Sequence, residues 1–116
     1  MYNIDENTGN IEMPRGDSAS IPIRIVNNDI PVDLSEYTLV FTVKEKLTDN
    51  DASEVFQISI TDHFNPTNGE TILKIPYDKT EIDVGKYHAE MRLDKGDERD
   101  RFWTKFLIIK NAVTQG

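Results

Sequence analysis

The chain has 116 residues, and its 21 acidic side chains outnumber 13 basic ones, which gives a formal net charge of −8. Hydrophobic residues make up 37% and charged residues 29% of the sequence. This length suits one domain with a single core, so we expect residues 1–116 to fold as one unit. An acidic surface repels phosphate backbones and anionic headgroups, which argues against nucleic acid or membrane as a partner.

Cysteine is absent, so the sequence offers no disulfide, no thiolate metal ligand and no cysteine nucleophile. The N-terminal stretch MYNIDENTGNIE has neither the basic region nor the apolar run of a signal peptide. The longest apolar runs, such as Phe106 to Ile109, are far shorter than the roughly 20 residues of a membrane helix. These features predict a soluble protein made in the cytosol.

Short segments with alternating apolar and polar residues follow one another along the chain, and a period of two predicts β-strands. A first strand is expected at about residues 8–13, and the others at 20–25, 37–46, 54–60, 70–76, 86–94 and 101–110. The alternation assigns these side chains to the core: Ile21, Ile23, Ile25, Leu39, Phe41, Val43, Phe56, Ile58, Ile60, Leu73, Ile75, Tyr87, Ala89, Met91 and Leu93. Segments rich in Asn, Asp, Gly and Pro separate the strands, and only YDKTEID offers room for one helical turn.

The last strand, RFWTKFLIIK, is apolar on both faces, so alternation alone does not orient it. We predict that one face serves the core: Phe102, Phe106 and Ile108. The other face then joins Val40 of the 37–46 strand in an exposed patch that contacts another protein: Val40, Trp103, Leu107 and Ile109. In the alternative, the N-terminal segment with Tyr2 and Ile4 folds across this patch and buries it.

About seven short strands at this spacing predict an all-β, immunoglobulin-like antiparallel β-sandwich. The stretch DVGKYHA places Asp83, Gly85 and Tyr87 as in the tyrosine corner of such sandwiches, in which the Tyr hydroxyl bonds back to the preceding chain. Ala89 takes the position of the second cysteine of antibody domains. The alternative interpretation is a simple glycine turn before a strand. In the sandwich, the loops at 27–36, 61–69 and 94–100 share one end.

Residues that carry chemistry are sparse. The two histidines, His63 and His88, lie far apart in the sequence without metal-ligand spacing, and no nucleophile motif is present. We therefore predict no catalytic residue, no metal site and no cofactor. The acidic stretch with Asp49, Asp51 and Ser53 alternates as calcium ligands do, but lacks the glycine and the bidentate glutamate of a calcium loop. We interpret it as a solvated acidic turn, with a weak calcium site as the alternative.

The tripeptide Arg15-Gly16-Asp17 is a sequence that adhesion receptors bind, but it precedes the strand at 20–25 instead of forming a long loop. Pro14 restricts the residue before it, and Gly16 permits a left-handed turn. We predict a strand-launching turn. At this end of the sandwich, Arg15 is expected to pair with acidic groups of the loop that contains Asp49, Asp51 and Glu54 or of the loop that contains Glu81 and Asp83.

Four stretches carry a family likeness: RGDSASIPIRI, PVDLSEYTLVFTVKEK, NGETILKIP and DVGKYHAEMRL. Together they resemble the N-terminal domain of the upper baseplate proteins of phages that infect Gram-positive bacteria, from about Arg15 to Ile109. The resemblance implies an immunoglobulin-type module that packs against other virion proteins in the tail tip. It also implies a virion component synthesised in the cytoplasm of a bacterial host.

The predicted function is a non-enzymatic structural module of a phage or prophage tail baseplate that docks onto other virion or baseplate proteins. Whether the chain also forms a homo-oligomer stays open. The alternative is a carbohydrate- or receptor-binding, adhesin-like sandwich in which Trp103 or the tyrosines stack on sugar rings.

Overall fold

The chain is all-β in the computed structural model, which describes residues 2–45 and 54–111. These residues form the strands β1 (Asn3–Ile4), β2 (Ile11–Pro14), β3 (Ala19–Arg24), β4 (Val26–Asn27), β5 (Ile30–Pro31), β6 (Thr38–Lys44), β7 (Glu54–Ile60), β8 (Glu70–Ile75), β9 (Gly85–Lys95) and β10 (Glu98–Lys110). Two short 3-10 turns occur at Pro66–Asn68 and Tyr77–Lys79, the second within the predicted YDKTEID segment. In the described ranges no helix is long and apolar enough to cross a membrane.

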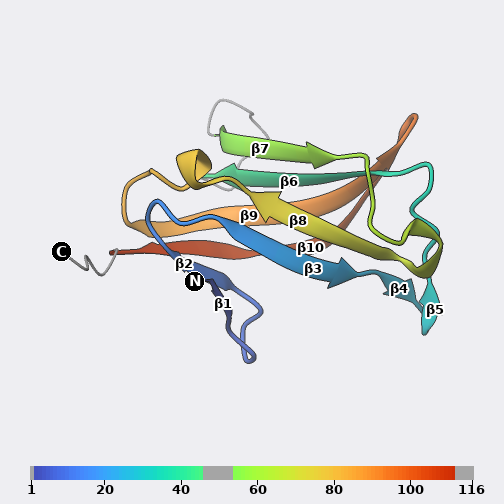
Figure 1. Cartoon of the computed structure of the whole chain (residues 1–116), viewed down its shortest axis with the longest axis horizontal. Helices are drawn as coiled ribbons and strands as arrows, with labels where there is room; N and C mark the ends of the chain where they lie inside the picture. The colour runs from blue at the N-terminus through green and yellow to red at the C-terminus, as the bar shows by residue number, and fades with distance from the viewer. Residues whose placement is uncertain (1, 46–53, 112–116) are drawn as a thin grey trace.

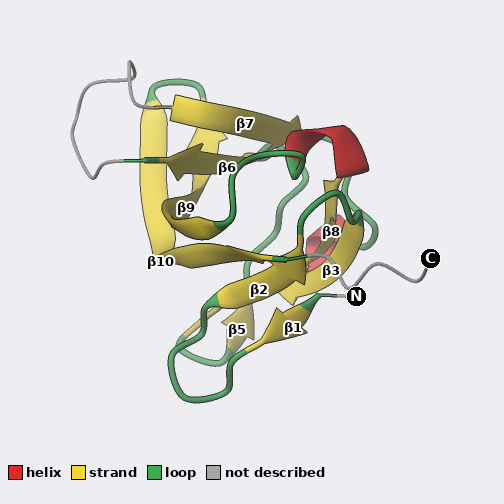
Figure 2. Ribbon diagram, turned by 90° about the vertical axis from the view of Figure 1, so that its left-hand side faces the viewer, coloured by secondary structure: helices red, strands yellow, loops and turns green. Residues whose placement is uncertain are grey.

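The strands form one large sheet and two small ones. The large sheet has six strands in the order β1-β2-β10-β9-β6-β7, while β3 pairs with β8 and β4 pairs with β5 in two-stranded sheets. Within the large sheet β2 and β10 run parallel, and the other pairs are antiparallel. The β3–β8 ribbon lies over one face of the large sheet, as Figures 1 and 2 show.

The core lies between this ribbon and the large sheet. Alternate residues of β9 are buried, and they are Tyr87, Ala89, Met91 and Leu93. They join the following side chains in one apolar cluster: Ile21, Ile25, Leu39, Phe41, Val43, Phe56, Leu73 and Ile75. Ile23, Ile58 and Ile60 are half-buried against that cluster. The core face that alternation predicts for these strands is therefore confirmed.

The last strand is oriented opposite to the prediction. Leu107 and Ile109 of β10 are buried in the core, whereas Phe102 is exposed and Phe106 and Ile108 are half-buried on the other face. The pairing explains the orientation, because Leu107 lies opposite Tyr87, and directly opposed residues of an antiparallel pair point to the same face. In addition, a β-bulge between Arg101 and Trp103 shifts the register.

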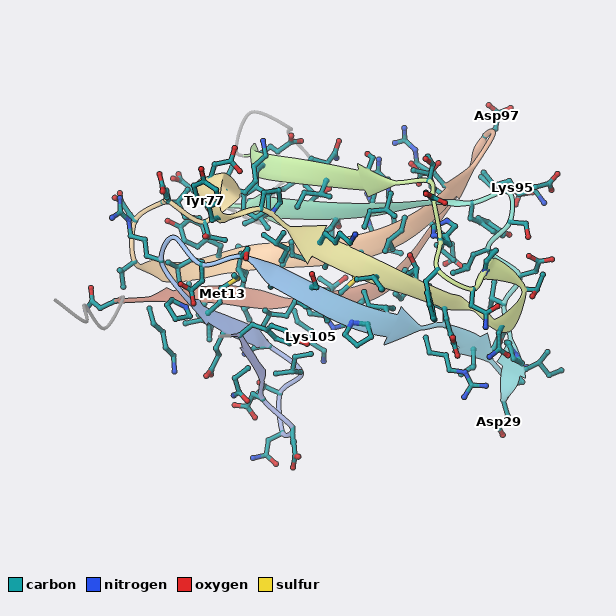
Figure 3. The ribbon with its side chains drawn as sticks, viewed as in Figure 1. Met13, Asp29, Tyr77, Lys95, Asp97 and Lys105 are labelled. Atoms are coloured by element: carbon teal, nitrogen blue, oxygen red, sulfur yellow. The ribbon has the colours of Figure 1, made fainter. Side chains whose placement is uncertain are left out.

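Two tight turns define one end of the molecule. In the β9–β10 hairpin Gly96 has a φ of 58°, and in the β4–β5 hairpin Asn28 and Asp29 have φ values of 53° and 65°. Such positive angles suit the primed turns that match the twist of paired strands. Asp97 and Asp29 lie at this end in Figure 3, opposite Tyr77. The predicted loops at 27–36 and 94–100 therefore contain paired residues, because β4, β5 and parts of β9 and β10 fall within them.

The grouping of three connections at this end is confirmed by contacts. The backbone N–H of Leu34 donates to the carbonyl of Pro66 over 2.8 Å. The ammonium of Lys95 lies 3.2 Å from a carboxylate oxygen of Glu36.

The predicted tyrosine corner is present. The hydroxyl of Tyr87 donates to the main-chain carbonyl oxygen of Asp83 over 2.6 Å. Burial raises the pKa of Tyr87 above its ordinary value, and the negative charges of Asp83 and Glu45 add to this effect. The bond ties the turn at Asp83 to the inner face of β9.

Candidate functional site

The predicted apolar patch is not on the surface. Val40, Leu107 and Ile109 are only 4%, 0% and 1% exposed. Leu107 and Ile109 face the core for the reason given above, and Trp103 is half-buried, with its ring centroid 6.3 Å from that of Phe41. These positions correct the predicted exposure of all four side chains.

Val40 does lie on the outer face of β6, as predicted, but its neighbours cover it. It sits opposite Ser59 of β7 and Arg92 of β9, in the middle of the sheet. The strands β6 and β10 do share a sheet, although β9 lies between them. The N-terminal alternative is not what the structure shows, because β1 and β2 extend the border of the sheet beside β10 instead of crossing the patch. Tyr2 packs against the core cluster, and Ile4 is exposed at 43%.

The outer face of β9 and β10 is covered by paired charges. Ion pairs join Arg92 to Asp94 over 2.9 Å, Arg101 to Glu90 over 3.0 Å, and Lys110 to Glu12 over 3.0 Å. Phe106 lies between two neighbours, because the ring of His88 is 5.0 Å from it and the ammonium of Lys86 lies 4.0 Å above it. The strand β10 also carries apolar side chains that are not fully covered, because Phe102 is 38% exposed and Phe106 and Ile108 are half-buried.

Phe64, in the connection between β7 and β8, is the most exposed large hydrophobic side chain in the described ranges, at 72%. It lines two shallow hollows on the surface. One hollow, of ≈ 500 Å³, is formed by Ser59–Phe64 with Ile72 and Lys74. The other, of ≈ 330 Å³, is formed by Pro22–Arg24, Phe64 and Glu70–Ile72. Pro22 and Ile72 lie opposite each other on the ribbon, so Phe64 extends an apolar strip that crosses β3 and β8.

His63 fixes the segment that carries Phe64. Its Nε2 lies 2.6 Å from the carbonyl oxygen of Tyr37, and its Nδ1 lies 2.9 Å from the hydroxyl of Thr71. A carbonyl oxygen only accepts, so Nε2–H donates to Tyr37 and Nδ1 accepts from Thr71. The imidazole is buried, and it anchors one side of Phe64 to the fold.

The polar side chains of the larger hollow do not form a catalytic triad among the described residues. Ser59, Asp62 and His63 line one hollow, but both ring nitrogens of His63 are engaged by structural partners and do not activate a nucleophile. Across residues 2–45 and 54–111 no three metal-ligating side chains come together. The calcium alternative concerned Asp49, Asp51 and Ser53, which lie outside the described residues.

The Arg15-Gly16-Asp17 tripeptide forms a turn that is bonded to the rest of the fold. Gly16 has a φ of 82°, and its N–H donates to the carbonyl of Thr80 over 3.2 Å. The hydroxyl of Thr80 donates to the carbonyl of Asp17 over 2.6 Å. The guanidinium of Arg15 donates through Nε to the carbonyl oxygen of Ile82 over 2.9 Å. The predicted turn is confirmed. The predicted pairing of Arg15 with an acidic group is not, because the contact is to the main-chain carbonyl of Ile82 between Glu81 and Asp83, while Asp49 and Asp51 of the other expected loop lie outside the described residues.

Sequence reasoning missed Phe64 and His63 because their segment, TDHFNPTNG, has no periodicity. The signal that it does contain is an aromatic residue among turn-forming polar residues. Such a ring has no place in a strand pattern and is a candidate for contact with a partner.

Comparison with known proteins assigns the chain to a family. A search among curated proteins found no match. The family model of the BppU N-terminal domain, from the phage baseplate upper protein, matches residues 2–115. This match covers nearly the whole chain and confirms the resemblance seen in the sequence. The chain therefore belongs to the family of BppU N-terminal domains of phage baseplate upper proteins.

Proposed function

We propose that this protein is a non-enzymatic structural module of a phage or prophage tail baseplate that docks onto other virion subunits. The observation that carries the proposal is the family match over residues 2–115. The family is one of baseplate structural domains and is not known to be enzymatic. A virion component of this kind is made in the bacterial cytoplasm and becomes part of the tail.

An immunoglobulin-like sandwich is the fold we propose for the module. Three features support it: the tyrosine corner at Tyr87, the two facing layers, and the sheet order in which β10, β9, β6 and β7 are neighbours. A rigid module of this type suits a structural role, because it presents loops and outer strand faces in fixed positions.

The surface around Phe64 is the part that we propose for docking. An exposed aromatic ring with hollows on both sides fits the anchor of an interface, in which one large side chain contributes much of the binding energy. Charged groups surround it, with Arg24 and Lys74 on the ribbon and Asp62 beside the ring. Another baseplate protein with an apolar projection and a polar rim is the partner that fits this surface.

The sugar-binding alternative is not supported by Trp103, the side chain it names first. It required Trp103 or a tyrosine as an open stacking surface. Trp103 packs against Phe41, and Tyr87 is buried in the corner. Tyr77 is exposed, at 62%, but it lines neither of the two hollows, and we therefore do not propose that function.

Docking can be tested by co-expressing the domain with each baseplate protein encoded beside it and measuring complex formation with the purified pairs. We expect one of these proteins to form a stoichiometric complex with the wild type. Phe64→Ser is expected to weaken that complex at least tenfold, because an interface anchor is lost. The matched control is Tyr77→Ser, since Tyr77 is also highly exposed, at 62%, and lies at the other end of the molecule (Figure 3).

The outcomes test the docking function and the proposed Phe64 surface separately. If no baseplate protein binds the folded wild type, the docking function is wrong. If a complex forms and Phe64→Ser binds as tightly as the wild type, docking stands but uses another surface.

A further inference from the structure

The strand β7 has a free edge. It pairs with β6, and no other strand of the described ranges pairs with it. Figures 1 and 2 both show β7 at the border of the large sheet, beyond β6. The main-chain N–H and C=O groups along such an edge can pair with a strand of another chain.

The strand β1 at the other border of the large sheet, and both strands of the β3–β8 ribbon, have features that hinder pairing with another chain, whereas β7 does not. The strand β3 carries Pro22, β8 carries Lys74, and β1 has only two residues. Proline, lysine and short length are the usual devices that prevent edge pairing. The stretch Val55–Ile60 of β7 has no proline and no charge in a chain with a net charge of −8.

We propose that β7 pairs with β7 of a second copy of this chain, antiparallel and around a twofold axis at Gln57. This register sets Phe56 opposite Ile58 of the second copy, and both side chains pack in the core cluster or against it. Phe56 and Ile58 belong to the core face in both copies, so the core sides of the two sheets stay aligned around the axis, and the β-bulge beside Glu54 interrupts the alternation only at the end of the strand. The two sheets become continuous.

Charge selects this register over the one centred on Ile58. With the axis at Gln57, Glu54 lies opposite Ile60 of the second copy and meets no like charge. If the axis moves to Ile58, Glu54 comes opposite Asp62, and two carboxylates directly opposite each other repel. The uncharged edge is where two acidic copies approach each other with little repulsion.

Twofold pairing of this kind is closed. The β7 edges of both copies are paired with each other, so no β7 edge is left for a third copy. Association therefore stops at the dimer and does not form a filament. The inference goes beyond docking onto other subunits, and its result is a pair of modules that presents two Phe64 surfaces at once.

Light scattering and sedimentation over a concentration series test the pairing. We expect the wild type to move from the 13.3 kDa monomer mass toward twice that mass as its concentration rises to about 1 mM, a range that detects dissociation constants up to that order. Gln57→Lys and Gln57→Glu each place two like charges across the axis, so each variant alone is expected to stay monomeric. An equimolar mixture of the two variants sets opposite charges across the axis and is expected to restore the dimer.

The matched control is Ser20→Lys, which adds the same charge at an exposed strand position on the β3–β8 ribbon. It is expected to dimerise like the wild type. Hydrogen exchange at the β7 amides is expected to slow as the dimer forms. A wild type that stays at the monomer mass up to about 1 mM overturns the proposal. So does a dimer that survives both Gln57 variants, or a mixture that stays monomeric while both variants are folded by circular dichroism.

Discussion

Gly69 stands at a position without room for a side chain. It ends the Pro66–Asn68 turn with a φ of 72°, and a Cβ there would collide with the carbonyl oxygen of Ile25 and lie 3.1 Å from that of Val32. Its own carbonyl accepts from the N–H of Ile25 over 2.8 Å. An Asn-Gly dipeptide such as Asn68-Gly69 is typical of a tight turn, and the close backbone approach adds a second reason for glycine.

We expect Gly69→Ala to lower the free energy of unfolding by about 3 kcal/mol, because a left-handed backbone and a backbone clash add up. The control is Gly96→Ala, since Gly96 also has a positive φ, of 58°, but no atom within 4 Å of the added carbon. Only the backbone term applies there, so we expect about 1 kcal/mol. Urea unfolding measures both, and equal losses would refute the role of the Ile25 carbonyl.

Tyr87 makes the stability depend on alkaline pH. Its raised pKa means that the folded state holds the phenolic proton more tightly than the unfolded chain, whose ordinary pKa is 10.0. The stabilisation that the protonated Tyr87 hydroxyl gives to the folded state is therefore complete below pH 10. It is lost as pH rises through the folded-state pKa of Tyr87. We expect Tyr87→Phe to cost about 1 kcal/mol at neutral pH. Urea unfolding should show this gap shrink above pH 10, and a constant gap would contradict the prediction.

At the scale of the element, β10 gives the clearest test of orientation. Leu107 and Ile108 are adjacent apolar residues, but Leu107 is fully buried and Ile108 is half-buried on the outer face. We expect Leu107→Ala to cost about 3 kcal/mol because it leaves a core cavity. Ile108→Ala is expected to cost about 1 kcal/mol. The reverse order in urea unfolding would mean that the sequence-based orientation was right.

The contrast between β9 and β10 shows what a sequence pattern resolves. β9 alternates strictly between apolar and polar residues, so its buried face is readable from the sequence. β10 is apolar on both faces, and only its register with β9 and β2 decides which face is buried. The candidate site was not predictable for a related reason. The segment of Phe64 is held by the bonds of His63 to Thr71 and Tyr37, and Tyr37 lies 26 residues away in the sequence.

For the whole molecule, the excess of acidic groups dominates the electrostatics. With a net charge of −8, the folded chain repels itself, and salt screens this repulsion. We expect about 150 mM NaCl to raise the thermal midpoint by about 3 °C at fixed protein concentration. At equal ionic strength CaCl2 and MgCl2 are expected to give the same midpoint. A rise specific to calcium would instead establish a site, with the acidic stretch at 49–53 as its first candidate.

The parallel pairing of β2 and β10 also sets the order of folding. Ile11 lies opposite Leu107 and Met13 opposite Ile109. One border of the core therefore joins the second strand of the chain to the last one. During translation β2 has only β1 as a neighbour until β10 has cleared the ribosome. We therefore expect the nascent chain to expose apolar side chains for most of its synthesis and the domain to close late, because contacts between distant parts of a chain form slowly.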